Sequence, residues 1–199
     1  MQNIVFDFGG VIFRWEPERI VQAVECEEQT RTHLLENIFR HPKWLDFDRG
    51  VLTVDEIVQH TAQRAALPAP LIAQVIELVP ALMTPFPETI ELLYQIKSTG
   101  KRLYALSNMP EPSMTYFETH YNFLDAFDGM VISSRVHMIK PEPQIYQHLL
   151  QTYCLHPQET LFIDDVEVNL QAAAATGMQT LKFVSPSQCK QELMRLGIL

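Results

Sequence analysis

Near its start the chain reads Asn3-Ile4-Val5-Phe6-Asp7-Phe8-Gly9-Gly10-Val11, an apolar run that ends in an acid and a glycine turn. A carboxylate at the end of a buried strand is costly unless a metal, a cation or backbone donors bind it. A second apolar run, Leu161-Phe162-Ile163, also ends in acids, Asp164-Asp165. Because the carboxyl ends of parallel strands meet at one edge of a sheet, the two stretches predict a shared, oxygen-lined metal site there.

The rest of the chain predicts a parallel sheet. Short apolar runs rich in β-formers occur at 3–7, 102–106, 129–132, 160–163 and 179–184. Between the last four runs lie helix-like stretches with terminal signals, such as Pro141-Glu142 at one start and Gly177 at one end. Strands that alternate with helices in this way indicate repeated β-α-β units and an α/β fold.

Residues 14 to about 84 differ, because they contain no convincing strand. Thr53 and Glu56 have the spacing of a helix capping box, and prolines interrupt the following connection. Helical segments are predicted at roughly 17–25, 29–40, 54–66 and 69–79. We therefore predict an α/β core domain made of residues 1–13 and 85–199, with an inserted helical domain at 14–84.

Composition limits the partners. The 199 residues carry a net charge of −9, which argues against nucleic acid as the main partner. No apolar run approaches the length of a membrane span, and the first residues lack the features of a signal peptide. The three cysteines have no paired spacing, which favours a reducing compartment and excludes a zinc motif. We expect a cytoplasmic monomer or weak homodimer that acts on a small molecule, without a nucleic-acid or membrane partner.

Polar residues also follow the predicted second and third strands. Ser107 and Asn108 come directly after the run at 102–106, and Lys140 precedes Pro141 beyond the run at 129–132. In open α/β sheets, ligands bind at the carboxyl ends of the strands. These residues are therefore expected beside Asp7 and the later acids.

This ordered set resembles the haloacid dehalogenase superfamily, which consists mostly of phosphatases with an aspartyl nucleophile. The motifs run in the family's order and the resemblance covers the whole chain. It is closest to a branch typified by glucose-1-phosphate phosphatase, and is also similar to the phosphatase domain of soluble epoxide hydrolase. The matching residues are Asp7-Phe8-Gly9-Gly10-Val11, Leu106-Ser107-Asn108, Ile139-Lys140-Pro141-Glu142 and Phe162-Ile163-Asp164-Asp165-Val166-Glu167-Val168-Asn169.

The resemblance implies a Rossmann-like sheet of five parallel strands in the order 5-4-1-2-3, with residues 14–84 as a helical cap. It also implies hydrolysis of a small phosphorylated metabolite, such as a sugar phosphate. Asp7 would attack phosphorus and form an aspartyl-phosphate. Ser107 and the Asn108 amide would hold the phosphoryl oxygens, and Lys140 would neutralise their charge.

The resemblance further implies a Mg²⁺ cofactor. Its ligands would be Asp7, the backbone carbonyl of Gly9 and Asp165. Asp164 would be an indirect ligand, and Asn169 would organise the acids from behind.

Gly9 departs from the family pattern. Many family phosphatases have a second Asp at this position as general acid and base, a role typically worth about 10²–10⁴-fold in rate. Three interpretations follow: a substrate with a good leaving group, another proton donor, or weak turnover.

Two other functions are compatible with parts of the sequence. A metal-independent 2-haloacid dehalogenase also uses an Asp nucleophile, but it would not need the adjacent pair Asp164-Asp165. A phosphate-binding protein without turnover explains Gly9, but not the other intact positions. Near the middle of the insertion, Trp44 and Phe47 are predicted to be packing residues, and the cluster of Asp46, Asp48 and Arg49 to be a solvated surface.

Overall fold

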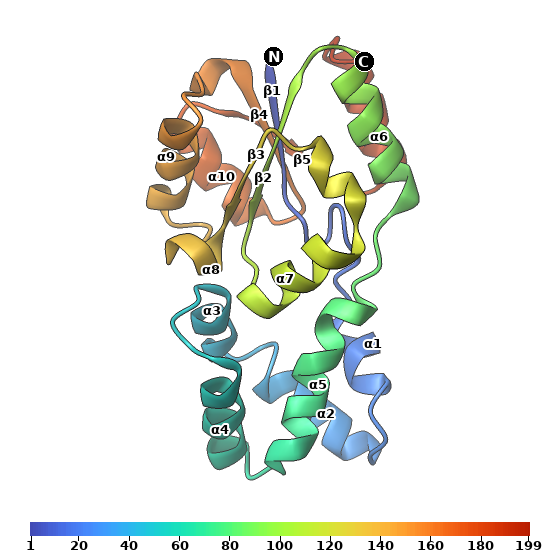
Figure 1. Ribbon diagram of the computed structural model, residues 1–199, viewed down its shortest axis with the longest axis vertical. Coiled ribbons are helices and arrows are strands. Elements are labelled where there is room, and N and C mark those ends of the chain that lie inside the picture. Colours follow the sequence, from blue (N-terminus) through green and yellow to red (C-terminus); the bar gives the residue numbers. More distant parts are fainter.

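The computed structural model describes residues 1–199 and has an α/β core with a helical layer beside it (Figure 1). Five parallel strands form one sheet, in the order β3-β2-β1-β4-β5. This confirms the predicted fold class and strand order. The strands are β1 (Asn3–Phe6), β2 (Arg102–Ser107), β3 (Gly129–Ile132), β4 (Thr160–Asp164) and β5 (Gln179–Lys182).

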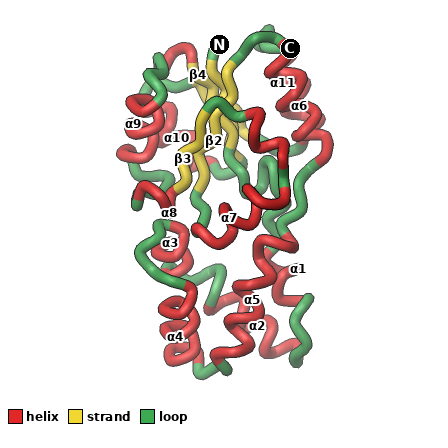
Figure 2. Tube along the Cα trace, viewed as in Figure 1, coloured by secondary structure: helices red, strands yellow, loops and turns green.

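Helices cover both faces of the sheet, which lies between them in Figure 2. Alternate strand residues point to opposite faces, so Ile4 and Phe6 pack on one side and Val5 on the other. The first face contacts α6 (Pro87–Ser98), α7 (Glu111–His120) and α11 (Pro186–Arg195). The second face contacts α9 (Pro143–Thr152) and α10 (Glu167–Ala175). Short helical turns complete the core as α8 (Ser133–Val136), η1 (Asn122–Ala126) and η2 (Pro157–Glu159).

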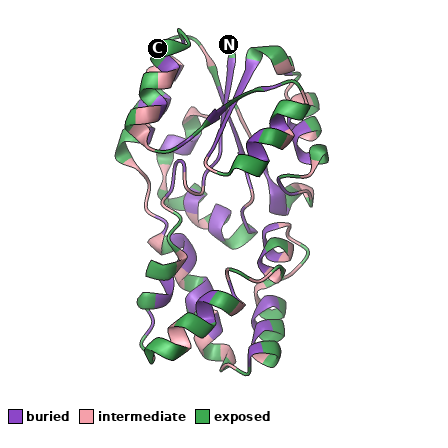
Figure 3. Ribbon diagram, turned by 180° about the vertical axis from the view of Figure 1, so that it is seen from behind, coloured by how far each residue is buried: buried purple, intermediate pink, exposed green.

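The central strands β1, β2 and β4 are almost completely buried, as Figure 3 shows. All four residues of β1 are buried, and all five of β4. Continuous apolar strands are expected where helices cover both faces of a parallel sheet. Asp164, the last residue of β4, is therefore placed in an environment where a carboxylate needs partners.

Residues 14–84, which we call the helical insertion, lie at the end of the molecule that faces the carboxyl ends of the strands (Figure 1). No strand occurs between β1 and β2, as predicted. The capping box at Thr53 and Glu56 is also present. The helices of the insertion are α1 (Pro17–Gln22), α2 (Glu28–Asn37), α3 (Lys43–Asp48), α4 (Val54–Ala65) and α5 (Ala69–Leu82).

The chain enters and leaves the insertion at adjacent points. Arg14 N donates a hydrogen bond to the Thr84 carbonyl at 2.9 Å, and Phe86 N donates to Ile12 O at 2.8 Å. One hydrophobic cluster runs from the first face of the sheet into the insertion. No helix of the molecule is both long and apolar enough to cross a membrane.

Candidate functional site

The register of the sheet brings the two predicted acidic stretches together. Phe6 pairs with Ile163, so that Asp7 and Asp164 are the next residues on neighbouring strands. The Asp7 amide extends this pairing by donating to the Ile163 carbonyl at 3.0 Å. Both acids thus leave the sheet at its carboxyl edge, where ligands of open α/β folds bind.

Three carboxylates meet at this edge. Asp7, Asp164 and Asp165 each offer one oxygen, and these oxygens lie within 4.8 Å of one another. Asp7 and Asp164 are buried, and Asp165 is half-buried. A cluster of carboxylate oxygens without nitrogen or sulfur ligands is the donor set that a hard cation such as Mg²⁺ prefers. The donor chemistry therefore fits the predicted metal.

Lys140 is the positive charge of the site. Its Nζ lies 2.8 Å from an Asp7 oxygen and 2.7 Å from an Asp164 oxygen, and its side chain is almost completely buried. Burial acts to lower the pKa of Lys140, but the two carboxylates outweigh this effect and leave the pKa raised. The ammonium therefore stays charged and links the two acids.

The acids respond to burial in the opposite way. Burial raises the pKa of Asp7 to about 7, although the charge of Lys140 acts to lower it. Burial and the neighbouring Asp164 also raise the pKa of Asp165. Carboxylates gathered in a buried site repel one another, so additional positive charge at this edge would favour their ionised forms.

A second set of contacts holds the charged groups in place. The Asn169 Nδ2 donates to both oxygens of Asp164, each at 3.1 Å, and the Val166 amide donates to Asp164 at 2.7 Å. The Asn108 side chain forms two hydrogen bonds with the backbone of Lys140, accepting from its N at 2.8 Å and donating to its O at 3.0 Å. The Asn108 side chain therefore positions the lysine.

Ser107 supplies an unpaired polar atom. Its Oγ is buried at the end of β2 and has no hydrogen-bond partner in the protein. A buried hydroxyl without a partner is costly unless a ligand completes its hydrogen bonding. This observation fits the predicted contact between Ser107 and a phosphoryl oxygen.

The glycine turn after Asp7 has two different glycines. At Gly10 the backbone φ is +76°, and an added Cβ would lie 2.4 Å from Asp165 Oδ2. Gly9 has no left-handed φ, and an added Cβ there would have its nearest neighbours at 3.9 Å. The backbone therefore leaves room for a side chain at Gly9 but not at Gly10.

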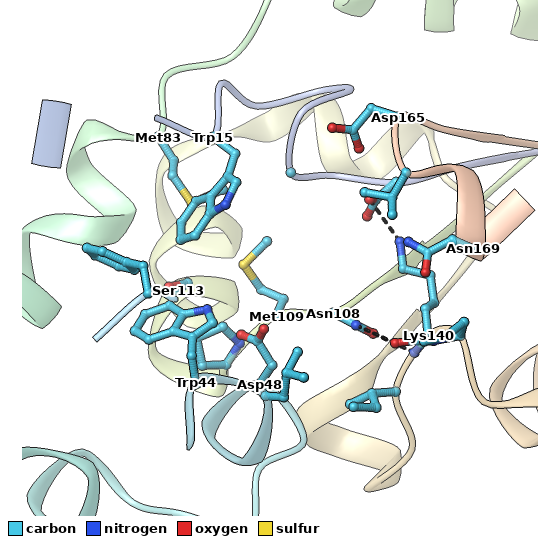
Figure 4. A pocket seen from close by; sticks show the side chains of 18 of the residues that line it. Trp15, Trp44, Asp48, Met83, Asn108, Met109, Ser113, Lys140, Asp165 and Asn169 are labelled. Atoms are coloured by element: carbon cyan, nitrogen blue, oxygen red, sulfur yellow. Dashed lines mark hydrogen bonds and ion pairs between the residues drawn. The ribbon is translucent and has the colours of Figure 1, made fainter. Parts of the chain in front are cut away.

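A pocket of about 420 Å³ opens in front of the acids, between the sheet edge and the helical insertion. In Figure 4, Asp165, Asn169 and Lys140 lie on one side of it, opposite Trp15 and Trp44. The insertion side is aromatic, with the rings of Trp15 and Trp44 stacked at 5.9 Å between centroids. The apolar residues that line the pocket are Trp15, Phe39, Trp44, Leu45, Val79, Met83, Met109, Ile139, Val166 and Val168.

Two features of this pocket escaped the sequence prediction. The helix α3 was not expected, and the solvated surface predicted for Asp48 is wrong, because Asp48 is buried and lines the pocket. Trp44 and Phe47 are packed as predicted, and Trp44 also lines the pocket. No signal in the sequence marks Asp48 as buried, because the contacts of its neighbours Arg49 and Gly50 with the core join positions far apart in the chain.

Comparison with known proteins identifies relatives along the whole chain. A haloacid dehalogenase-like hydrolase family profile matches residues 1–177. The chain is 31% identical over 193 residues to a sesquiterpene phosphatase of Aspergillus oryzae, covering 96% of this chain and 94% of that protein. It is 25% identical over 207 residues to a D-ribitol-5-phosphate phosphatase of Bacteroides thetaiotaomicron, covering 97% of each.

A local similarity and a solved structure agree with these matches. The chain is 41% identical over 70 residues to bifunctional epoxide hydrolase 2 of Mus musculus, covering 35% of this chain and 13% of that protein. A crystal structure of a Bacteroides thetaiotaomicron HAD family enzyme, in complex with magnesium and inorganic phosphate, superposes with a TM-score of 0.74. The superposition covers 92% of this chain and 93% of that one, at 22% identity. The chain therefore belongs to the haloacid dehalogenase-like hydrolase family.

Proposed function

We propose that this hydrolase is a Mg²⁺-dependent phosphatase that cleaves a small phosphomonoester through an aspartyl-phosphate on Asp7. One observation carries the proposal. A buried carboxylate at a strand end is paired with a buried lysine, and both line a pocket whose wall contains a further acid, Asp165. This arrangement provides a nucleophile, a fixed positive charge and oxygen ligands for a cation.

Each polar side chain of the site has a separate role at the phosphoryl group. Asp7 attacks phosphorus with one oxygen, while Lys140 Nζ balances the charge that the phosphoryl oxygens bring into the pocket. The Ser107 hydroxyl, which lacks a protein partner, donates to one of those oxygens. The Asn108 side chain holds the backbone of Lys140 in position. The Asn108 amide also contacts a phosphoryl oxygen.

The metal-binding groups we propose are Asp7, the backbone carbonyl of Gly9 and Asp165. Asp164 contributes indirectly, because it already accepts hydrogen bonds from Lys140 and Asn169. When bound, Mg²⁺ neutralises charge on the phosphoryl oxygens and on the carboxylates. This role explains why so many acids share one edge.

We assign the helical insertion, residues 14–84, as a cap domain that covers the site, and residues 1–13 and 85–199 as the core domain. The insertion is joined to the core by two adjacent connections and supplies one wall of the pocket. The wall on the sheet edge carries the charged groups. The cap therefore contacts and selects the alcohol part of the substrate, and the core binds the phosphate.

The predicted sugar phosphate is one candidate substrate, and a polyol phosphatase is among the relatives. The pocket favours a second candidate, the phosphate of an apolar alcohol. The insertion wall presents Trp15, Trp44 and Met83 and a single carboxylate, which offers few hydrogen bonds to sugar hydroxyls. The similarity to a sesquiterpene phosphatase agrees with this candidate.

The cellular setting we propose is the cytoplasm, with a monomer or weak homodimer acting on a small phosphorylated metabolite and no nucleic-acid or membrane partner. The net charge of −9 supports the choice against nucleic acid. The three cysteines, all free, support a reducing compartment.

The test is release of inorganic phosphate by the purified protein, with Mg²⁺ or with EDTA, from p-nitrophenyl phosphate, a sugar phosphate and a prenyl phosphate. We expect activity with Mg²⁺, none with EDTA, and preference for the prenyl ester. Asp7→Asn, which keeps the shape but cannot attack phosphorus, should be inactive. Halide release from a 2-haloacid without metal would support the dehalogenase alternative. Phosphate binding without turnover would support a binding protein.

A further inference from the structure

Asp48 is a buried carboxylic acid without a partner in the protein. It is the last residue of α3 and is only 7% exposed. Its backbone carbonyl accepts a hydrogen bond from the Ser133 hydroxyl, but no hydrogen bond or ion pair reaches its carboxylate. Its carboxylate oxygens are not among the fully enclosed unpartnered atoms of the protein, so they are open to the pocket and free to contact a ligand there.

The end of α3 is attached firmly to the core. The Arg49 guanidinium donates two hydrogen bonds to the Glu142 carboxylate, at 2.8 and 2.6 Å. At Gly50, where φ is +75°, an added Cβ would lie 2.4 Å from the backbone oxygen of Ser134. Asp48, which immediately precedes these two residues, is therefore held at a defined position beside α8 and the start of α9.

Asp48 also lies on the side of the pocket where the leaving group must be. In phosphoryl transfer the attacking and leaving oxygens are roughly in line, on opposite sides of phosphorus. With Asp7 on the sheet edge, the leaving oxygen faces the helical insertion. Asp48 is the only titratable side chain that the insertion contributes to the pocket lining, and Figure 4 shows its carboxylate directed toward the centre.

We propose that Asp48 is the general acid and base of the reaction, in place of the acid that is absent at Gly9. This inference rests on the proposed phosphatase function. It assigns Asp48 a direct contact with the leaving oxygen of the substrate, and so explains why an unpaired carboxyl is kept in the pocket.

The proton balance of the two steps is simple. In the first, an Asp7 oxygen bonds to phosphorus, the phosphorus–alcohol oxygen bond breaks, and the Asp48 proton moves to the departing oxygen to give the free alcohol. In the second, water attacks phosphorus and gives a proton to the Asp48 carboxylate, while the bond from Asp7 to phosphorus breaks. Inorganic phosphate leaves, and both acids return to their starting forms.

The electrostatic surroundings support the protonated starting form. Burial raises the pKa of Asp48 well above its ordinary value of 3.8. The nearby Asp7 carboxylate acts in the same direction, and Lys140 acts against it. A carboxyl group whose pKa is raised in this way holds its proton more strongly than an exposed acid and is suited to donate it to an alkoxide.

Asp48→Asn tests the proposal by its dependence on the leaving group. We would measure kcat/KM with Mg²⁺ for a prenyl or simple alkyl phosphate and for p-nitrophenyl phosphate. An alkoxide needs a proton in order to leave, whereas p-nitrophenolate is stable as an anion. The variant should lose about 10²-fold or more with the alkyl ester. Its kcat/KM for p-nitrophenyl phosphate, which reports only the steps up to transfer onto Asp7, should be nearly unchanged.

Asp46→Asn is the matched control, because Asp46 lies on the same helix, is paired with Lys43 at 2.8 Å and does not line the pocket. It should behave as the wild type does with both substrates. Asp48→Ser, a second variant without a carboxyl, should repeat the selective loss if Asp48→Asn folds poorly. Equal losses with both substrates, or no loss with either, would overturn the role of Asp48. A wild type without Mg²⁺-dependent activity on p-nitrophenyl phosphate would instead contradict the proposed function.

Discussion

Gly9→Asp introduces a carboxylate two residues after Asp7, the proposed nucleophile, and the structure predicts that the chain will accept it. An added Cβ would have Met83 Cε and Trp15 Cβ as its nearest neighbours, both at an ordinary contact distance of 3.9 Å. The Gly9 backbone is outside the left-handed region. Replacing such a glycine typically stabilises a protein by about 0.4–1 kcal/mol through the unfolded chain. The added charge near Asp7 opposes this gain, so Tm should change by no more than about 2–4 °C.

The effect on activity depends on Asp48. In the Asp48→Asn background, Gly9→Asp should return about 10²-fold or more of the lost kcat/KM for an alkyl phosphate, the usual value of a general acid. In the wild-type background the gain should be much smaller, because Asp48 already supplies the proton. The two sites therefore form a double-mutant cycle with strong coupling.

The assay is Mg²⁺-dependent phosphate release by the four proteins of this cycle, with an alkyl phosphate and p-nitrophenyl phosphate. Gly9→Ala is the control, because it fills the same space without a carboxyl and should restore nothing in the Asp48→Asn background. If Gly9→Asp raised kcat/KM for the alkyl phosphate as much in the wild type as in the Asp48→Asn background, Asp48 would not be the general acid. It also fails if Gly9→Ala restores activity as well as Gly9→Asp does.

Three further variants test other parts of the site. Lys140→Met should lose several orders of magnitude in kcat and destabilise the fold by about 3–5 kcal/mol in urea unfolding, because it leaves the Asp7 carboxylate buried and unpaired; a fully stable variant would contradict this. Gly10→Ala should weaken Mg²⁺ binding by about 10–100-fold, measured from the Mg²⁺ dependence of activity, since its Cβ would displace the Asp165 carboxylate; unchanged affinity would remove Asp165 as a ligand. Asp48→Leu should raise stability by about 1–3 kcal/mol in the same unfolding assay, because an unpartnered buried acid is removed; a loss of stability would indicate a structural role for Asp48.

The core of the fold and the acidic edge were predictable because both depend on local patterns. Apolar runs bounded by glycine and proline predicted all five strands. The predicted bounds differ from the observed ones by at most two residues. Parallel pairing then places the strand ends together, so Asp7 and Asp164 had to be neighbours once the order was known. The packing of Trp44 was predictable because a large aromatic side chain is usually buried, and its ring packs against Phe47.

The wall opposite the acids could not be predicted in the same way. Asp48 lies among charged residues in the sequence, a pattern that is usual for a solvated surface. Its burial depends on Arg49 reaching Glu142, a contact between positions 93 residues apart. It depends also on the close approach of Gly50 to the backbone of Ser134. Such contacts are properties of how two parts of the chain fit together, and no local spacing encodes them.

The open space beside Gly9 has a consequence for how this chain could diverge. In a phosphatase whose general acid lies two residues after the nucleophile, the proton comes from the sheet edge. The residues of the helical insertion that line the pocket can then change without loss of the proton donor. In this chain the proton donor lies on α3, so a change of wall that removes Asp48 also removes the chemistry. Adaptation to new alcohols is therefore confined to residues such as Trp15 and Met83, unless position 9 first acquires an acid. Related proteins should therefore have an acid at the position of Gly9 or at the position of Asp48, and the one should replace the other.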